Sequence, residues 1–235
     1  MSLSIVLCTY NEENNIRSCL NKLVKNNLVN EIIIIDDNSQ DNTIKIIQEF
    51  NDRKIKLTIR QNTKGFASAL IYGMASTSSE YILRLDTDMY NQVDYLINSF
   101  ELNKAYDFCN FSRYIINGKD LRGNLRNYSS KFINIICYYL LSKKITDYTS
   151  CIFFIKKKLL ADVFPNNTKY ANFIIEFVYN IINKNLNYKE LPFVQEKNTE
   201  NFSKSAPNLL KFFANGSFYF ITIIKCLITK LNFKL

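Results

Sequence analysis

The stretch Glu31-Ile-Ile-Ile-Ile-Asp-Asp37 is the clearest guide to the fold of this chain. It is an apolar run of strand length, too continuous for burial on one face only, so it predicts a parallel strand covered on both faces. Similar short runs alternate with helical patterns along the first half: strands at 3–9, 55–60 and 81–85, and helices at 16–24, 41–50 and 66–76. This alternation predicts an α/β fold built from βαβ units with right-handed crossovers.

The second half of the chain is less regular. Its patterns predict strands at 107–114, 151–155 and 188–191, and helices at 126–141 and 172–183. No linker is long enough to separate two domains, and from Pro207 the chain becomes aromatic and apolar. We therefore expect one domain over residues 1–206, followed by an apolar, basic and amphipathic helical segment over 207–235.

Composition limits the chemistry that is available. The chain has 235 residues, 30 basic and 21 acidic side chains, a net charge of +9 and no histidine. This excludes a His general base, a Ser-His or Cys-His nucleophile and a His-ligated metal. The six cysteines are scattered without a C-x-x-C pair, which argues against zinc and against a disulfide framework. Proton transfer must use carboxylate, Lys, Tyr or Cys, and a metal must be held by oxygen or thiolate.

Acidic residues follow three of the predicted strands, in Asn11-Glu12, Asp36-Asp37 and Asp86-Thr-Asp88. A single Asp at a strand end is more often a helix cap than a ligand. Capping does not explain doubled carboxylates, which repel each other unless a cation or ligand donors neutralise them. The carboxyl ends of parallel strands meet at one edge of a sheet. The pattern therefore predicts a site for Mg²⁺ or Mn²⁺ that bridges a diphosphate.

Four motifs make roughly the first 90 residues resemble the inverting family 2 glycosyltransferases. T-Y-N-E and D-x-D are weak patterns individually, but the four occur together in the order and spacing of that family. The resemblance implies the GT-A fold, a Rossmann-like, mostly parallel central sheet flanked by helices. The motifs are Thr9-Tyr-Asn-Glu12, Ile35-Asp-Asp-Asn-Ser-Gln-Asp-Asn-Thr43, Asn62-Thr-Lys-Gly-Phe-Ala-Ser-Ala69 and Leu85-Asp-Thr-Asp88.

The resemblance also implies roles for the residues of these motifs. Asp86 and Asp88 form the D-x-D element, with Asp88 as the direct ligand of a metal that neutralises the departing nucleoside diphosphate. Lys64 or Arg60 would assist the phosphates, although a solvated side chain is an equally good interpretation. Ala67 stands where the third motif usually has a second glycine. The residues implied to bind the base, the ribose and the rest of the nucleotide-sugar are Thr9, Tyr10, Glu12 and Asp37.

Motifs in the second half narrow the resemblance to polyprenyl-phosphate sugar synthases of the dolichol-phosphate mannose synthase type. In that family two arginines and a serine grip the phosphate of the acceptor lipid, which implies this role for Arg113, Arg126 and Ser130. Guanidinium groups match phosphate oxygens, and residues four apart share a helix face. The alternative for the pair on the helix is a basic surface. The motifs are Ser112-Arg113-Tyr114, Arg126 with Ser130, Asp147-Tyr-Thr-Ser150, Phe173-Ile-Ile-Glu176, Glu190-Leu-Pro192 and Ser203-Lys204.

The chain departs from the family pattern at several places. The family run T-S-G-F-R is Thr149-Ser150-Cys151-Ile152-Phe153 here, without the Gly and the Arg. The later run R-x-x-G-x-S-K becomes 198–204 and loses another Arg and Gly, with Lys197 as a neighbouring substitute. Tyr90 follows D-x-D where the family commonly has Gln, Ser or His. These losses leave the donor sugar and the acceptor-phosphate site open.

One absence favours a phosphate acceptor. Relatives that glycosylate hydroxyl groups usually carry a Glu-Asp pair whose Asp is the general base, and this chain has no Glu-Asp dipeptide. A lipid phosphate is already ionised and needs no base in order to attack. Glu176 is the alternative base if the acceptor is a hydroxyl.

Membrane contact is a further expectation. Residues 212–224 carry no charge but number only thirteen, fewer than the roughly 18–20 apolar residues that span a bilayer. Lys211 and Lys225 flank this run, which favours an interfacial helix drawn to anionic lipid. Packing on the core or on a partner is an even alternative, and 132–141 has the same ambiguity. The N-terminus has no signal-peptide pattern, so we expect a cytosolic location.

These observations lead to one hypothesis and two alternatives. The first is a metal-assisted transfer of a hexose, mannose or glucose, from a nucleotide-sugar to dolichyl or undecaprenyl phosphate, on the cytosolic face of a membrane. The second keeps the family but takes a saccharide hydroxyl in polysaccharide or glycolipid synthesis. The third is a nucleotide-sugar-binding pseudoenzyme. No nucleic-acid motif is present, and the oligomeric state is open.

Overall fold

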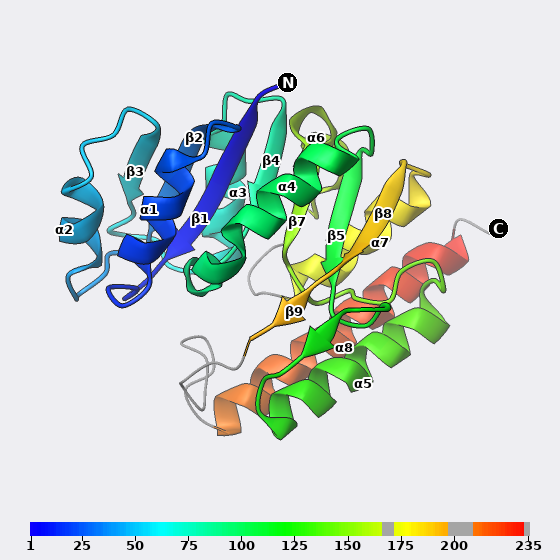
Figure 1. The fold of residues 1–235 in the computed structure, drawn as a ribbon. Coiled ribbons are helices and arrows are strands. Elements are labelled where there is room, and N and C mark those ends of the chain that lie inside the picture. Colours follow the sequence, from blue (N-terminus) through cyan, green and yellow to red (C-terminus); the bar gives the residue numbers. More distant parts are fainter. Residues whose placement is uncertain (166–171, 197–208, 233–235) are drawn as a thin grey trace. The chain divides into compact units, whose positions relative to one another are not determined.

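The computed structural model describes residues 1–165, 172–196 and 209–232, with the backbone alone at 209–215 and 232. The chain forms two compact units. Unit 1 contains residues 1–109 and 152–162, and unit 2 contains 110–151 and 163–235. The polypeptide thus leaves unit 1, enters unit 2, and returns to unit 1 before it ends in unit 2 (Figure 1).

Unit 1 is the alternating α/β part that the first half of the sequence predicts. Strand β1 pairs in parallel with β2 and β4, β2 pairs in parallel with β3, and β7 runs antiparallel to β4. Figure 1 shows α1 and α4 in front of these strands and α3 behind them. The elements are β1 (Leu3–Thr9), α1 (Ile16–Lys25), β2 (Val29–Asp36), α2 (Thr43–Gln48), β3 (Ile55–Ile59), α3 (Phe66–Ser76), β4 (Tyr81–Arg84), the 3₁₀ helices η1 (Thr87–Gln92) and η2 (Lys157–Leu159), α4 (Val93–Asn103) and β7 (Phe153–Lys156).

Burial in unit 1 explains the apolar isoleucine run at 32–35, which lies in β2. All four isoleucines of β2 are at most 1% exposed, as expected for a parallel strand with helices on both faces. Helix α3 comes especially close to this sheet at Gly73. A Cβ added there would lie 2.8 Å from Val6 Cγ1 and 3.1 Å from Ile35 Cγ1. The predicted mostly parallel, helix-flanked sheet is therefore confirmed.

The register of the strands positions the site. Thr9 pairs with Asp36, so β1 and β2 end at the same level, and the loops after them start side by side. Asn11 and Asn38 each adopt a positive φ in these loops, 55° and 60°, a conformation that Asn tolerates better than most residues. The acidic motifs that follow β1 and β2 are therefore held at one edge of unit 1.

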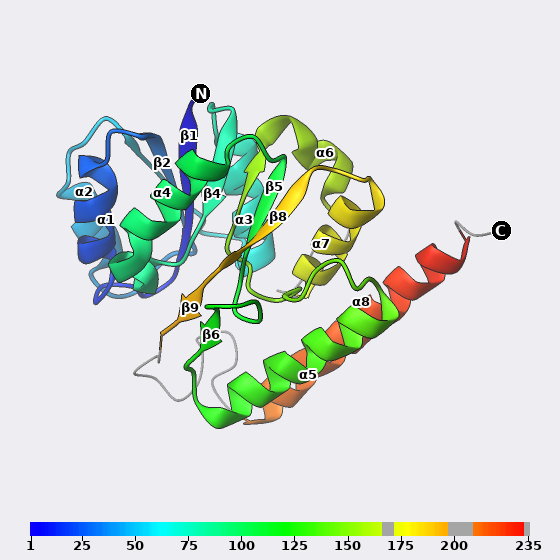
Figure 2. The ribbon, with the colours of Figure 1, turned by 45° about the vertical axis from the view of Figure 1, so that its right-hand side comes forward.

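Unit 2 combines short strands with long helices. Helices α5 and α8 lie side by side in both ribbon views (Figures 1 and 2), and α7 packs against α8. The short strands β6 and β9 pair in parallel. Strand β5 begins in unit 1 and ends in unit 2, whereas α6 begins in unit 1 and ends at the first residue of the second segment of unit 2. The elements are β5 (Phe108–Ser112), β6 (Lys119–Asp120), α5 (Asn124–Leu140), α6 (Leu160–Val163), α7 (Phe173–Asn183), β8 (Tyr188–Pro192), β9 (Val194–Gln195) and α8 (Leu209–Asn232).

The C-terminal helical segment expected over 207–235 is present as α8, a helix of 24 residues. It is much longer than the uncharged run at 212–224, because the helix continues through Lys225 and Lys230. Among the described residues, no helix combines the length and the apolar character that crossing a membrane requires.

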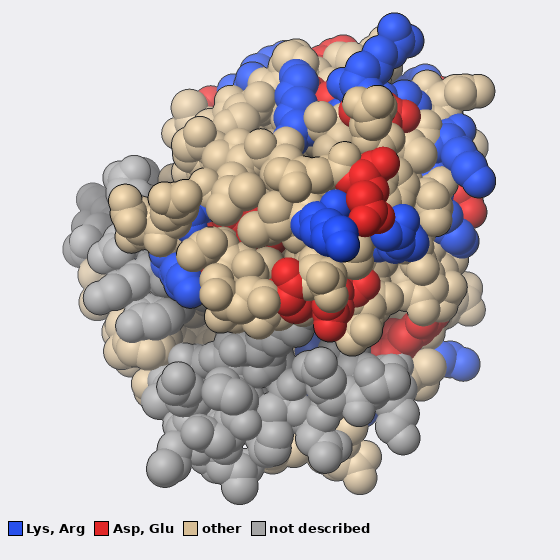
Figure 3. All heavy atoms as spheres, turned by 90° about the vertical axis from the view of Figure 1, so that its left-hand side faces the viewer, with Lys and Arg blue, Asp and Glu red and all other residues tan. Residues whose placement is uncertain are grey.

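Charge is distributed unequally between the units. Unit 1 has 14 basic and 15 acidic residues, whereas unit 2 has 16 and 6, so the whole surplus of +9 belongs to unit 2. On the face drawn in Figure 3, blue basic and red acidic side chains lie among one another rather than in separate areas. Several of the basic and acidic side chains of unit 1 form ion pairs with each other, such as Arg17 with Glu49 and Lys56 with Glu31.

Candidate active site

Asp36, the first carboxylate after β2, holds the loop together. Its side chain is fully buried and accepts hydrogen bonds from Thr9 Oγ1, Ser39 N and Ser39 Oγ, each at 2.7 Å. Thr9 is thereby placed at the end of β1, with its hydroxyl committed to Asp36. One of the two carboxylates in the Asp36-Asp37 pair is therefore structural.

The second carboxylate, Asp37, is paired with Arg60 from the end of β3. Arg60 Nε donates to Asp37 Oδ1 at 2.7 Å, and Gly65 N donates to Asp37 Oδ2 at 2.8 Å. Arg60 Nη1 also donates to Ser68 Oγ at 2.9 Å. Gly65 has a φ of 134°, which is costly for any other residue, so this turn into α3 depends on glycine. The structure thus places Arg60 in a buried ion pair that shapes the third motif.

Tyr10 and Lys64 form the more open part of the strand-end region. Lys64 Nζ lies 5.1 Å from the centroid of the Tyr10 ring, and Tyr10 is 38% exposed. An accessible ring beside an ammonium group offers a face for stacking a nucleotide base and a charge for a phosphate. The structure therefore brings together two residues that come from different sequence motifs.

Glu12 joins the first motif to D-x-D. Thr87, the middle residue of D-x-D, donates from Oγ1 to Glu12 Oε2 at 2.7 Å, and Asn15 Nδ2 donates to the same oxygen at 3.1 Å. The backbone N of Glu12 donates to Thr43 Oγ1 at 2.7 Å. The carboxylate of Glu12 is thus held beside the end of β4.

The two carboxylates of D-x-D have different surroundings. Asp86 forms an ion pair with Arg84, whose Nη1 donates to Asp86 Oδ2 at 3.2 Å. Arg84 is 2% exposed, and its guanidinium lies 4.8 Å from the centroid of the Phe66 ring. Asp88 Oδ1 is buried and has no hydrogen-bond partner among the described residues. The two carboxylates therefore differ: Asp86 is paired with Arg84, whereas one oxygen of Asp88 has no hydrogen-bond partner in the described part of the chain.

Electrostatics support this distinction. The pKa of Asp88 is raised from its ordinary value of 3.8 to about 7, by burial first and by the charges of Asp86 and Glu12 next, against the opposing charge of Arg84. The same negative field acts on Cys19 of α1. Burial raises the pKa of the Cys19 thiol to about 12, with contributions from Asp88, Asp86 and Glu12. Three carboxylates therefore converge on a region with too little positive charge to neutralise them.

This arrangement fits a divalent metal for which the protein would supply only some of the ligands. In the part of the chain that the structure describes, no three Cys, Asp or Glu side chains are grouped so that they could hold an ion by themselves. The unpaired Oδ1 of Asp88 nevertheless offers a hard oxygen ligand in a negative field. Mg²⁺ and Mn²⁺ prefer oxygen, and Mg²⁺ is usually bound through one or two carboxylates together with substrate phosphates. The residues present therefore fit an ion that arrives with a diphosphate.

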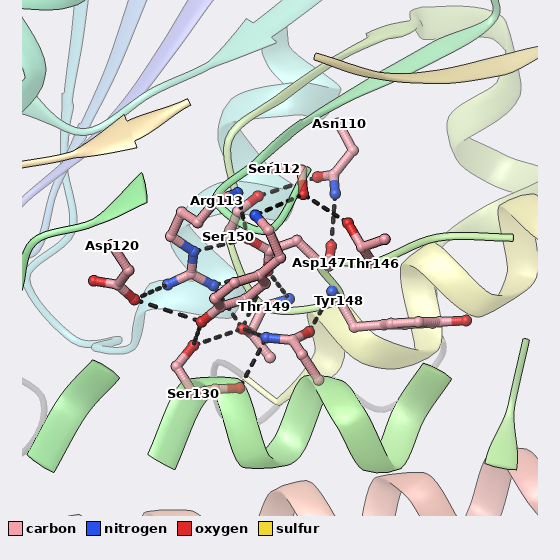
Figure 4. Close-up of polar contacts among 12 residues, drawn as sticks. Asn110, Ser112, Arg113, Asp120, Ser130, Thr146, Asp147, Tyr148, Thr149 and Ser150 are labelled. Atoms are coloured by element: carbon pink, nitrogen blue, oxygen red, sulfur yellow. Dashed lines mark hydrogen bonds and ion pairs between the residues drawn. The ribbon is translucent and has the colours of Figure 1, made fainter. Parts of the chain in front are cut away.

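In unit 2, Arg113 lies in a buried ion pair with Asp147 (Figure 4). Arg113 Nε donates to Asp147 Oδ2 at 2.7 Å, and Nη2 donates to Oδ1 at 2.8 Å. The Asp147 side chain is fully buried, and that of Arg113 is 2% exposed. Burial acts against both charges, but their attraction prevails: the pKa of Arg113 rises and that of Asp147 falls. The structure thus places this arginine, predicted to grip a phosphate, in a carboxylate pair.

Ser130 belongs to the same polar network. Tyr114 Oη donates to Ser130 Oγ at 3.0 Å, and Ser130 Oγ lies 3.2 Å from Thr149 Oγ1. Thr149 Oγ1 also accepts from Arg113 Nη2 at 2.8 Å, so the serine is linked to the ion pair through one threonine (Figure 4). Arg126 lies one turn earlier on α5 and is half-buried. The structure therefore brings Ser130 and Arg113 into one network.

Two residues of this network escape sequence reasoning. Asp120 is buried and accepts from Arg122 Nε at 2.9 Å and from Arg122 Nη2 at 2.6 Å. Arg113 Nη1 approaches the same carboxylate at 3.4 Å. Asp120 and Arg122 are two apart in the sequence and follow no motif, so no signal distinguishes them from surface charges. In unit 1, the buried Arg84 also lies outside the predicted site, although an arginine within the apolar strand Tyr-Ile-Leu-Arg is a usable signal.

The acidic residues of the later motifs, Glu190 and Glu176, also accept hydrogen bonds within the protein. Glu190 accepts from the backbone N of Thr146 at 2.8 Å and from that of Asp147 at 3.1 Å, and burial raises its pKa. Glu176 accepts from Lys225 Nζ, at 2.6 Å on one oxygen and 2.8 Å on the other. The motif at 198–204 and the neighbouring Lys197 lie outside the described residues.

Comparison with known proteins establishes the family. The model of glycosyl transferase family 2 matches residues 4–164, which is more than half of the chain. This chain therefore belongs to glycosyl transferase family 2. The match covers the whole candidate site of unit 1 and the Arg113–Asp147 pair of unit 2.

Curated relatives are similar over shorter stretches. A dolichol-phosphate mannosyltransferase of Pyrococcus furiosus is 28% identical over 123 residues, covering 51% of this chain and 35% of that protein. The glucosyltransferase WfgD of Escherichia coli, named for UDP-Glc and α-D-GlcNAc-diphosphoundecaprenol, is 34% identical over 87 residues, covering 37% of this chain and 34% of that protein. This chain thus spans about a third of the length of these relatives.

Solved structures confirm the fold over nearly the whole chain. Glucosyl-3-phosphoglycerate synthase from Mycobacterium tuberculosis in complex with UDP is similar with a TM-score of 0.71, at 16% identity, over 96% of this chain and 80% of that one. The same enzyme with Mn²⁺, UDP and glucosyl-3-phosphoglycerate gives a TM-score of 0.70 at 15% identity, over 96% and 80%. The predicted GT-A architecture is thereby confirmed.

Proposed function

We propose that this protein is an inverting glycosyltransferase that moves a hexose, mannose or glucose, from a nucleotide-sugar to a polyprenyl phosphate such as dolichyl or undecaprenyl phosphate. The observation that carries the proposal is the buried Oδ1 of Asp88, which lacks a partner among the described residues and lies in the field of Asp86 and Glu12. Such an oxygen suits the metal of a nucleotide-sugar complex in this family. The names of two curated relatives, which contain dolichol phosphate and diphosphoundecaprenol, support a polyprenyl acceptor.

The residues of unit 1 would bind and orient the donor. Tyr10 offers its half-exposed ring to the base, and Lys64 beside it offers an ammonium to the phosphates. Asp37 holds the turn at Gly65, and Glu12 braces D-x-D through Thr87. Asp88 would hold Mg²⁺ or Mn²⁺, with Asp86 oriented by Arg84. When bound, the metal neutralises the charge that develops on the leaving nucleoside diphosphate.

The reaction needs no general base if the acceptor is a phosphate. An oxygen of the lipid phosphate forms a bond to the anomeric carbon, the bond from that carbon to the diphosphate breaks, and its electron pair leaves with the nucleoside diphosphate. Arg126 and Ser130 would contact the acceptor phosphate. Arg113 would support them through Thr149, because its own guanidinium is paired with Asp147. The protein would work peripherally at the cytosolic face of a membrane.

A saccharide hydroxyl is the second candidate acceptor, because the name of WfgD includes a GlcNAc that is already attached to the lipid carrier. A hydroxyl acceptor needs a base. Glu176, the alternative base, forms an ion pair with Lys225 that occupies both of its oxygens. This geometry favours the phosphate acceptor over the hydroxyl.

The test is transfer of labelled sugar from GDP-mannose and UDP-glucose in the presence of Mn²⁺, with undecaprenyl phosphate, a saccharide-diphosphate lipid, or no acceptor. We expect lipid-extractable product only with the polyprenyl phosphate. Asp88→Asn should lower the rate about 10²–10³-fold, the magnitude found when one group that stabilises charge in a transition state is removed. The matched control is Asp94→Asn, at an exposed aspartate of α4 in the same unit, which should leave the rate unchanged.

The other outcomes are also informative. Product that forms only with the saccharide-diphosphate lipid would replace the acceptor and keep the family chemistry. No product with any of the acceptors, together with UDP or GDP binding that survives Asp88→Asn, would instead indicate a nucleotide-sugar-binding pseudoenzyme.

A further inference from the structure

Helix α5 exposes a stripe of large apolar side chains. They recur at intervals of three and four residues, the spacing that brings side chains onto one face of a helix. The opposite side of the helix buries Asn134 and Cys137. The exposed residues of the stripe are Leu125, Tyr128, Phe132, Ile135, Tyr139 and Leu140, between 44% and 69% exposed.

Helix α8 carries a second stripe next to the first. Its exposed apolar residues are Phe220, Ile221, Ile224, Ile228 and Leu231, whereas Ile223 and Cys226 are buried. The rings of Phe132 and Phe220 meet with their centroids 6.5 Å apart. Lys230 Nζ donates to the carbonyl oxygens of Leu140 and Leu141 at 2.9 and 2.8 Å, which fixes the end of α5 against α8. We call these eleven exposed side chains the α5–α8 face.

The α5–α8 face is unusual for a protein surface. Single exposed apolar side chains are normal, but eleven of them on two adjacent helices that meet at Phe132 and Phe220 mark a docking surface. The two helices lie side by side in both ribbon views (Figures 1 and 2). The question is then which partner covers the face.

The charges that the two helices themselves carry are all of one sign. Helices α5 and α8 contain no Asp or Glu, but five Lys or Arg residues. Lys131 is exposed beside the apolar stripe of α5, and Lys143 and Lys144 follow the end of that helix. Lys225 on α8 is also exposed, but it is paired with Glu176 of α7. By contrast, acidic and basic side chains are mixed on the face drawn in Figure 3. The partner of the α5–α8 face must therefore be apolar at its centre and negative around it.

We infer that the α5–α8 face docks on the surface of a bilayer that contains anionic lipid. A second copy of this chain fits less well, because a two-fold interface would bring the same basic side chains against each other. An anionic bilayer offers an apolar layer for the aliphatic side chains, an interfacial zone that suits tyrosine rings, and negative head groups for the lysines. The inference rests on the proposed function, because docking on a membrane brings the protein to an acceptor lipid that lies in that membrane.

The experiment is cosedimentation of the full chain with vesicles of phosphatidylcholine alone or with 30% phosphatidylglycerol added, in about 0.1 M salt. We expect binding to the anionic vesicles only. The double variant Phe132→Ser/Ile224→Ser should weaken the binding at least tenfold, because it removes two exposed apolar side chains. Lys131→Gln/Lys143→Gln should weaken it about fivefold for each lysine and reduce its salt dependence.

Matched controls have the same chemistry elsewhere. Leu102→Ser on α4, at a leucine that is 85% exposed, and Lys25→Gln at the end of α1 should not change vesicle binding. Urea unfolding of each variant checks that the fold is kept. Lys131 and Lys143 are both exposed, so their replacement by Gln should not disturb folding. This variant therefore tests the inference even if Phe132→Ser/Ile224→Ser fails to fold.

The results separate this inference from the proposed function. Wild-type protein that ignores anionic vesicles, or variants that bind them as the wild type does, would overturn the docking surface. So would a wild-type dimer in light scattering that becomes a monomer in the Phe132→Ser/Ile224→Ser variant without any change in vesicle binding. Vesicle binding without sugar transfer would leave the docking surface standing and overturn only the proposed function.

Discussion

Asp88 in unit 1 is partly buried and Asp147 in unit 2 is fully buried, yet their surroundings shift the two pKa values in opposite directions. Asp147 has a bidentate arginine and backbone donors, and its pKa falls below the ordinary range. Asp88 has other carboxylates nearby and one oxygen without a partner among the described residues, and its pKa rises to about 7. A carboxylate with all its partners in place serves the fold, whereas one that lacks them is suited to a ligand.

The largest effect is expected when the satisfied carboxylate is removed. Asp147→Ala leaves the buried guanidinium of Arg113 without its bidentate partner and with only Asp120 at 3.4 Å, and breaking a buried pair in this way costs about 3–5 kcal/mol. Urea unfolding measures the loss, with the exposed Asp94→Ala as the control. A loss below about 1 kcal/mol would mean that Asp147 is no more a part of the fold than a surface residue.

Removing the charge of the unsatisfied carboxylate should have the opposite sign. Because the folded-state pKa of Asp88 is raised from 3.8 to about 7, the stability that the protonated form contributes is fully present below pH 4 and is lost as the pH rises through 7. Asp88→Asn avoids this loss. Without metal, its stability gain over the wild type should grow by roughly 2 kcal/mol between pH 5 and pH 8.

Thermal or urea unfolding at the two pH values tests this prediction. A gain that is equal at both would show that Asp88 is ionised in the folded protein across the whole range. Addition of Mn²⁺ and UDP should stabilise the wild type and leave the variant almost unchanged.

A pair of glycines contrasts the packing of the two units. In Gly73→Ala the new Cβ would lie 2.8 Å from Val6 Cγ1, and overpacking of this kind costs about 1–3 kcal/mol. In Gly216→Ala on α8 the new Cβ would meet no atom within 4 Å, so the better helix propensity of alanine should stabilise the protein by about 0.5–1 kcal/mol. Urea unfolding of both variants should give opposite signs, and equal signs would contradict the close approach of α3.

The smallest effect is expected at the junction of α5 and α8. Lys230→Met removes two hydrogen bonds to the last carbonyl groups of α5, with an expected loss of about 1 kcal/mol or less. Hydrogen exchange of the amides near Leu140 should increase while those in the strands of unit 1 stay unchanged. Unchanged exchange at Leu140 would show that this contact does not hold the helix end.

The regular part of the fold could be predicted because its signals are local. The isoleucine run of β2 indicates a strand buried on both faces whatever its neighbours are, and the structure confirms β1 to β4 within a few residues of the predicted bounds. The carboxylates at the strand ends follow from the same pattern, since each motif comes directly after its strand. The placement of these carboxylates at the ends of neighbouring strands could therefore be predicted from the sequence.

The partners of the charged residues could not be predicted, because they are set by contacts between distant segments. Arg113 and Asp147 are 34 residues apart, and Arg60 reaches Asp37 across 23. Nothing in either local sequence distinguishes a paired arginine from one that binds phosphate. The contacts likewise group α8 with residues 110–151 in unit 2. Contacts between segments that are far apart in the sequence cannot be predicted from the local sequence pattern.

The return of the chain to unit 1 has a consequence for the order of folding during synthesis. Strand β4 acquires its antiparallel partner β7 only after all of residues 110–151 have left the ribosome. Until then the edge of β4 is an unpaired, apolar template of the kind that aggregates. A nascent chain arrested after residue 109 should therefore depend on chaperones, whereas one arrested well beyond Lys156 should not.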